Sequence, residues 1–179
     1  MTVVLGVDPG FVNLGWAILF CQGSSVTVMA SGVHVLLRSW KGACSTDMAD
    51  AVRRLREKLV EQGLQWDLFF IEQQYQSRGI NAAVSGRLRC LEWALSSGLS
   101  TSPFDQAIAS RTLKARFGTA TGNHADNKTR ARQWVETNSK NFPRDLTDHE
   151  ADAVMVAISG YCTNESRRIT SLEPVVFLE

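Results

Sequence analysis

The chain has 179 residues, 44% of them hydrophobic, and carries 19 Lys and Arg against 18 Asp and Glu, which gives a net charge of +1. This length is enough for one domain with a full hydrophobic core, whereas two domains would each be marginal, so we expect a single domain over residues 1–179. No apolar run approaches the roughly 18 residues that span a bilayer, and the start of the chain lacks the basic and small-residue features of a signal peptide. We therefore expect a protein that is neither secreted nor inserted in a membrane.

The alternation of β-rich and helical patterns begins with three short strands separated by turn residues. A further apolar run ends at Glu72, and another follows about 30 residues later. The predicted strands are residues 2–8, 15–20, 26–32 with a continuation to about 37, 66–71 and 104–109.

Helices are predicted between and after these strands. Apolar side chains recur at spacings of 4, 3 and 4 in two segments, which is typical of an amphipathic helix that packs one face on a core. The second of these helices ends at Gly98, and the tail after about residue 166 has no assignable element. The predicted helices are residues 47–62, 84–98, 111–117, 127–138 and 148–162.

The order β-β-β-α-β-α-β-α-α favours an α/β fold with a mixed five-stranded sheet. The first three strands would form an antiparallel meander, and right-handed crossover helices would add the later strands in parallel. In that arrangement the first strand is central and helices cover both faces of the sheet.

Two acidic residues lie at strand ends. Asp8 interrupts "LGVDPGFVNLGWAI" where the first strand ends, and Glu72 follows "DLFFI". If these strands are parallel neighbours, both carboxylates emerge at the same end of the sheet. Asp-Pro-Gly is also a favourable turn that needs no chemistry to explain it.

A third group of acids starts the last helix, in "DLTDHEADAVMVAIS". Thr147 and Glu150 form a possible capping box. Asp152 shares a helix face with His149 at i, i+3 or with Asp148 at i, i+4. These acids could instead serve only the helix terminus and its dipole.

Acids that meet beside a core either raise their pKa values and stay neutral or bind a divalent cation. Oxygen ligands favour Mg²⁺ or Mn²⁺ over zinc. Close carboxylates also fit a pair of cations about 3.5 to 4 Å apart, an arrangement that activates water and stabilises the departing oxygen in phosphodiester cleavage.

Basic residues gather in the middle of the chain, where residues 78–144 contain eleven Lys and Arg against four Asp and Glu. Such an excess could supply a phosphate-binding face, although a solvated surface of mixed charge would have the same composition. The four cysteines show no CxxC pair or zinc-ligand spacing, so we expect reduced thiols in a reducing compartment. They are Cys21, Cys44, Cys90 and Cys162.

Three acidic motifs, "GVDPGFVNLGWAI", "FFIEQQY" and "HEADAVMVAIS", resemble those of the RuvC-type Holliday junction resolvases, which have the ribonuclease H-like fold, and they occur in the same order. The resemblance implies that Asp8 bridges two metal ions, Glu72 holds one and Asp152 holds the other. His149 falls where the family has a fourth active-site Asp or His, and it could bind a metal or move a proton. Asp148 replaces it if the helix register differs.

The resemblance also implies DNA contacts. Tyr75 lies where the family has an aromatic residue that stacks on an unpaired base, although it could equally be packed at the start of a helix. The segments "SRTLK" and "ADNKTR" resemble the family's lysine-bearing segments and place Lys114 and Lys128 near the scissile phosphate. Ordinary surface charge is the alternative for these bases. Further backbone contacts are expected from Arg78, Arg87, Arg89 and Arg130.

The implied activity is a magnesium-dependent endonuclease, with Mn²⁺ as a substitute and two ions per active site. It would cut four-way DNA junctions as a homodimer by paired symmetric nicks that leave 5′-phosphate and 3′-hydroxyl ends, in recombination and repair, in the cytoplasm or another reducing compartment that contains DNA. A helicase partner is not implied.

Three alternatives stay open. A related nuclease could act on RNA or on flaps, and a junction-binding module would need no metal. An actin-like ATPase needs a second glycine-rich phosphate loop, which the sequence lacks.

Overall fold

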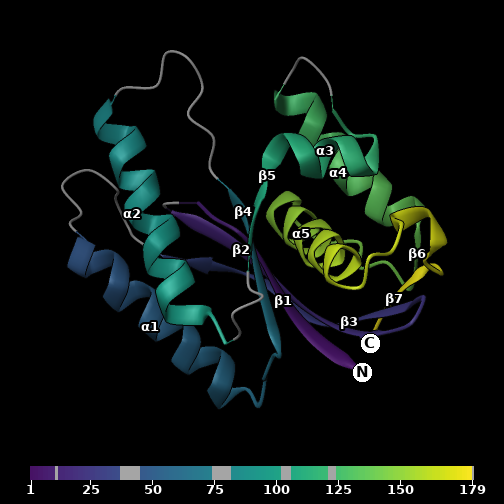
Figure 1. The fold of residues 1–179 in the computed structure, drawn as a ribbon, viewed down its shortest axis with the longest axis horizontal. Coiled ribbons are helices and arrows are strands. Elements are labelled where there is room, and N and C mark those ends of the chain that lie inside the picture. The colour runs from purple at the N-terminus through teal and green to yellow at the C-terminus, as the bar shows by residue number, and fades with distance from the viewer. Residues whose placement is uncertain (11, 37–44, 74–81, 102–105, 121–123, 179) are drawn as a thin grey trace.

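Figure 1 shows the computed structural model of the chain, which describes residues 1–10, 12–36, 45–73, 82–101, 106–120 and 124–178. In these residues seven strands form one sheet in the order β5-β4-β1-β2-β3-β7-β6. The strands are β1 (Thr2–Asp8), β2 (Asn13–Gln22), β3 (Ser25–Val35), β4 (Leu68–Gln73), β5 (Gln106–Ala109), β6 (Ser139–Lys140) and β7 (Val175–Phe177).

Helices cover both faces of this sheet, as predicted. On one face lie α1 (Ser45–Glu61) and α2 (Ala82–Leu99), and on the other lie α3 (Ser110–Phe117), α4 (His124–Thr137) and α5 (Asp148–Asn164) (Figure 1). Each face has its own cluster of buried apolar side chains. The five predicted helices are therefore present, and the amphipathic spacing that predicts α1 is borne out because Met48, Leu55 and Leu59 are fully buried.

Strand β1 pairs antiparallel with β2 and parallel with β4. Its side chains alternate between the two cores, with Val4 on the α5 side and Leu5 and Val7 on the α1 and α2 side, as the two-residue period of a strand requires. Among the five strands that the sequence predicts, β1 is central, as expected.

The strand count corrects the sequence prediction, because the sheet has seven strands rather than five. The additional strands β6 and β7 have two and three residues, too few to show a periodic pattern. The tail after residue 166 forms a 3₁₀ turn at Ile169–Ser171 and then β7, which runs parallel beside β3. Glu173 anchors it, because its amide donates to the Ser24 carbonyl and its carboxylate accepts from the Ser24 hydroxyl at 2.8 Å.

Helix α5 packs with its backbone directly against β1 of the sheet. A Cβ atom on Gly6 of β1 would come within 2.3 Å of the Ala153 carbonyl oxygen, so the strand can meet the helix backbone only because residue 6 has no side chain. From Ala151 to Cys162 every residue of α5 except Asp152 is buried. The helix is thus a fixed support whose first turns reach the end of β1.

Among the described helices, none combines the length and apolarity that crossing a bilayer requires. Cys21, Cys90 and Cys162 are free thiols, and Cys44 lies outside the described residues.

Candidate active site

The ends of β1 and β4 bring Asp8 and Glu72 together. Val7 of β1 pairs with Ile71 of parallel β4, so the two acids occupy the next position on neighbouring strands. Because Val7 and Ile71 belong to the core on the α1 and α2 side, the alternation of the strands places both acids on the α5 side. Each acid is only 8% exposed.

The two carboxyl groups interact directly. Burial raises the pKa of Glu72 above its usual value of 4.5, and the charge of Asp8 and a hydrogen bond to it raise that pKa further. The Ser110 hydroxyl donates to Glu72, and the nearby charge of Lys114 also lowers the Glu72 pKa, but neither offsets the burial. In the absence of a cation, burial and the neighbouring Asp8 therefore favour the protonated form of Glu72 more than water does.

A raised carboxyl pKa in the folded state has a direct consequence for stability. The proton-bound Glu72 contributes stability that is fully present below the unfolded pKa of about 4.5 and is lost as pH rises through the folded pKa. In EDTA, Glu72→Gln should therefore be more stable than the parent at pH 8, and the difference should disappear toward pH 4. Urea unfolding at several pH values measures this, and a difference that does not change with pH would contradict it.

His149 completes this group from the first turn of α5. Its Nδ1 lies 2.7 Å from Oδ2 of Asp8. Because a carboxylate can only accept, the imidazole donates through Nδ1, and in the neutral ring Nε2 has the lone pair that can bind a metal or a proton. Gly15, the cross-strand partner of Asp8, allows this approach, since a Cβ there would meet the His149 carbonyl oxygen at 2.1 Å.

The predicted capping box fixes the start of α5. The Glu150 amide donates to Oγ1 of Thr147 at 3.2 Å, and the Thr147 amide donates to the Glu150 carboxylate at 3.0 Å. The Ser31 hydroxyl of β3 donates to the other Glu150 oxygen at 2.9 Å. The turn that carries His149 is therefore held both by its own cap and by the sheet.

Removing the Thr147 cap should lower the stability of the fold without removing any side chain of the acidic site. Thr147→Ala is expected to lower the free energy of unfolding by about 0.5 to 2 kcal/mol, because the Glu150 amide loses its acceptor. Denaturant unfolding measures this. Thr147→Ser keeps the hydroxyl and should retain most of the stability, so an equal loss in both variants would argue against the cap.

Asp152 and Lys114 lie on the two helices beside the acidic pair. Asp152 follows His149 by three residues on α5 and is half-buried in an otherwise buried stretch. Lys114 is half-buried on α3, close enough to Glu72 for its charge to act on that carboxyl. The guanidinium of Arg116 donates to Oγ of buried Ser159 at 2.7 Å and so ties α3 to α5.

In the described part of the chain, no three or more carboxylate, imidazole or thiol side chains are already grouped to hold a metal ion. Mg²⁺ nevertheless needs no complete protein cage, since it is usually bound by one or two carboxylates together with water and substrate phosphates. The buried Asp8 and Glu72 pair fits that chemistry, because a cation would offset the repulsion between the two carboxylate charges.

The remaining predicted residues fall into three groups. Tyr75 and Arg78 lie outside the described residues, and Lys128 belongs to α4 with a side chain that is not described. Arg87 and Arg89 lie on α2, which covers the face opposite α5. Asp148 is half-buried at the start of α5, and Arg130 is exposed on α4.

Sequence reasoning missed the supporting residues Ser110, Ser31 and Gly15. Ser110 begins α3 directly after β5, whose Ile108 pairs with Glu72, so the position of "SRTLK" after the fifth strand could have indicated it. For Ser31 and Gly15 the sequence carries no comparable signal.

Comparison with known proteins finds a relative in sequence, although no protein-family model matches the chain. The chain is 28% identical over 167 residues to the crossover junction endodeoxyribonuclease RuvC of Sodalis glossinidius (strain morsitans), which covers 89% of this chain and 86% of that protein.

Solved structures are similar over nearly the whole chain. A structure of T. thermophilus RuvC in complex with a Holliday junction substrate has a TM-score of 0.60 at 16% identity and covers 93% of this chain and 98% of that chain. A complex of Fowlpox virus resolvase with substrate Holliday junction DNA has a TM-score of 0.57 at 15% identity. It covers 91% of this chain and 98% of the resolvase chain. These findings confirm the resemblance to RuvC and the predicted ribonuclease H-like fold.

Proposed function

We propose that this chain, which is similar to RuvC in sequence and shares its ribonuclease H-like fold, is an endonuclease that resolves four-way (Holliday) DNA junctions. The observation that carries the proposal is the buried pair of Asp8 and Glu72 on neighbouring strand ends, with His149 bonded to Asp8 at 2.7 Å. Support for the substrate comes from the similar proteins, one named as a crossover junction endodeoxyribonuclease and two solved with Holliday junctions.

The proposed cofactor is Mg²⁺, two ions per active site, with Mn²⁺ as a substitute. Asp8 and Glu72 would hold the ions, with Asp152 and His149 as further ligands. When bound, such ions supply an activated water and a counter-charge for the leaving 3′-oxygen.

The protein side chains do the positioning. Asp8 is oriented by its bond from His149, and Glu72 by its bond from Ser110, so both carboxylates are fixed before substrate arrives. Lys114 places a positive charge beside Glu72 where a phosphate oxygen could be bound, and Lys128 is proposed to do the same from α4. Nε2 of His149 can accept a proton released near Asp8.

The proposed assembly is a homodimer, because a two-fold symmetric substrate presents equivalent strands to two copies of one surface. Two equivalent sites would make paired symmetric nicks. If water attacks phosphorus and the 3′-oxygen leaves, each nick would have 5′-phosphate and 3′-hydroxyl ends. Tyr75 is proposed to stack on an unpaired base, and Arg78, Arg87, Arg89 and Arg130 to contact the DNA backbone. A reducing compartment that contains DNA, such as the cytoplasm, suits this activity.

The test is cleavage of a synthetic four-way junction with each strand labelled in turn, in Mg²⁺, in Mn²⁺ and in EDTA. We expect nicks at symmetric positions on two opposing strands that ligase can seal, in either metal and not in EDTA. A flap and an RNA–DNA hybrid of the same sequence serve as controls. Faster cutting of either control would favour the related nuclease activity, and binding without any cutting would favour a junction-binding module.

A further inference from the structure

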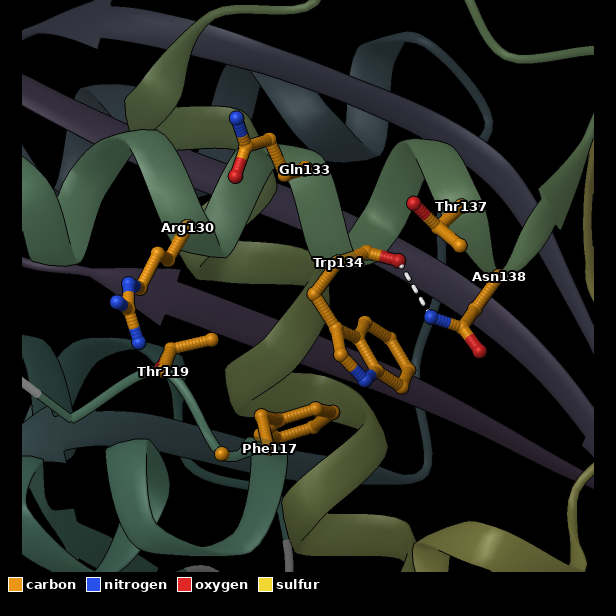
Figure 2. A pocket seen from close by; sticks show the side chains of 8 residues that line it. Phe117, Thr119, Arg130, Gln133, Trp134, Thr137 and Asn138 are labelled. Atoms are coloured by element: carbon orange, nitrogen blue, oxygen red, sulfur yellow. Dashed lines mark hydrogen bonds between the residues drawn. The ribbon is translucent and has the colours of Figure 1, made fainter.

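A pocket of about 340 Å³ lies between the end of α3 and one face of α4, outside the acidic site. This volume is within the range of about 300 to 1,000 Å³ that is typical of small-molecule sites. Figure 2 shows the residues that line it, which are Phe117, Gly118, Thr119, Arg130, Gln133, Trp134, Thr137 and Asn138.

The α4 side of this pocket is a polar helix face. Arg130, Gln133, Trp134 and Thr137 follow one another at i, i+3, i+4 and i+7 and so lie on one side of the helix. The opposite side, which includes Ala131 and Val135, is buried in the core. Arg130, Gln133 and Thr137 are exposed, so the pocket opens to solvent along this face.

The charge of the pocket is positive. Arg130 contributes a guanidinium, and none of the eight lining residues is acidic. Within the described ranges no ion pair involves Arg130, whereas Arg53 on α1 is paired with both Asp50 and Glu57. In Figure 2 the Arg130 side chain extends toward Thr119 across the pocket. An unpaired guanidinium in such a position suits a phosphate group.

Aromatic side chains form the other wall. The rings of Trp134 and Phe117 meet edge to face, with centroids 4.5 Å apart and an angle of 81° between their planes. Phe117 is buried and Trp134 is half-buried, so the indole is fixed by its neighbour and still reaches the pocket (Figure 2). A fixed aromatic surface next to a cation matches the two halves of a nucleotide, a planar base and a phosphate.

The pocket lies within reach of a strand bound at the acidic site. Ser110, which donates to Glu72, begins α3, and Gly118 ends it eight residues later. Eight residues of helix span about 12 Å. Since one strand of DNA advances about 3.4 Å per nucleotide, the pocket is on the order of two to four nucleotides from the phosphate near Glu72.

We propose that this pocket binds one nucleotide of the DNA strand that is cut, with its phosphate on Arg130 and its base against Trp134. The inference rests on the proposed nuclease function and adds a second contact point on the same strand, which would hold that strand in register with Asp8 and Glu72.

The experiment measures binding of junctions in which one nucleotide at a time, from one to five positions on either side of the cut, lacks its base. Dissociation constants are determined in EDTA, so that cleavage does not interfere. For the parent, one position two to four nucleotides from the cut should weaken binding about five-fold or more when abasic. For Trp134→Leu the same abasic position should have almost no further effect, because the base has lost its partner.

The phosphate contact is tested through salt. Arg130→Gln should lower the slope of log affinity against log salt by about 1, as expected for the loss of one phosphate contact. Arg132→Gln is the matched control, because Arg132 lies on the same helix and donates instead to the Arg144 carbonyl at 2.8 Å. In Arg132→Gln, each abasic position should weaken junction binding as much as it does in the parent. Thermal unfolding of all three variants excludes loss of fold as the cause.

The experiments distinguish failure of the nuclease proposal from failure of the nucleotide pocket. The protein could cut junctions in Mg²⁺ while every abasic position weakens binding of Trp134→Leu as much as it weakens binding of the parent. In that case the nucleotide pocket is wrong and the nuclease proposal stands. If deoxynucleoside monophosphate binds the parent and not Arg130→Gln while junctions are neither bound nor cut, the pocket serves a free nucleotide and the strand contact proposed here is wrong.

Discussion

Asp8→Asn is expected to reduce the single-turnover rate of junction cleavage in Mg²⁺ by about a thousand-fold or more, while binding of the junction in EDTA stays close to that of the parent. The amide keeps the shape of the carboxylate and removes the charge that a divalent cation requires. It also removes the like charge beside Glu72, which raises the Glu72 pKa in the parent. The variant should therefore fold at least as well as the parent without metal.

Asp145→Asn is the control for Asp8→Asn, because it removes one carboxylate charge from an exposed position. It should cut at the parental rate. If Asp8→Asn cut at that rate too, the acidic pair could not be the catalytic centre, whatever substrate the protein acts on.

Gly15→Ala has the second large expected effect. The new Cβ would lie 2.1 Å from the His149 carbonyl oxygen, so the first turn of α5 has to move away from β2. Overpacking of this kind lowers the free energy of unfolding by about 1 to 3 kcal/mol. Displacement of His149 from Asp8 should also slow cleavage by about a hundred-fold. Urea unfolding and single-turnover cleavage measure the two effects separately.

Gly86→Ala is the matched glycine variant. It lies in α2, and a Cβ there would meet nothing within 4 Å. It should leave cleavage unchanged and raise helix stability by about 0.5 to 1 kcal/mol. If Gly15→Ala behaved like Gly86→Ala, the close packing of α5 on β2 would not be what positions His149 beside Asp8.

The sequence is informative where a pattern repeats over enough residues. The spacing of Met48, Leu55 and Leu59 predicts α1, and the apolar run before Glu72 predicts a short strand, which is β4. The meander and the crossover order then place Asp8 and Glu72 at one end of the sheet, where the structure has them. The Thr147 and Glu150 capping box is a local signal, and it too is present.

The features that the sequence does not predict depend on contacts between distant segments. Strand β7 forms because Val175 and Phe177 reach the edge of β3 after a turn, and three residues are too short to show a period. Ser31 is recognisable as a support of α5 only once β3 lies beside Glu150, 119 residues later in the chain. The pocket beside α4 likewise needs Phe117 and Trp134 from different helices.

Crystals of the protein soaked in Mn²⁺ at neutral pH test the central claim most directly, because anomalous scattering locates the ion independently of any assay. We expect Mn²⁺ between Asp8 and Glu72, with carboxylate oxygens at about 2.0 to 2.3 Å, and loss of that signal in Asp8→Asn crystals. Saturating Mn²⁺ that leaves Asp8 and Glu72 still bonded to each other, with no ion at either carboxylate, would contradict the assignment of these residues as the metal centre.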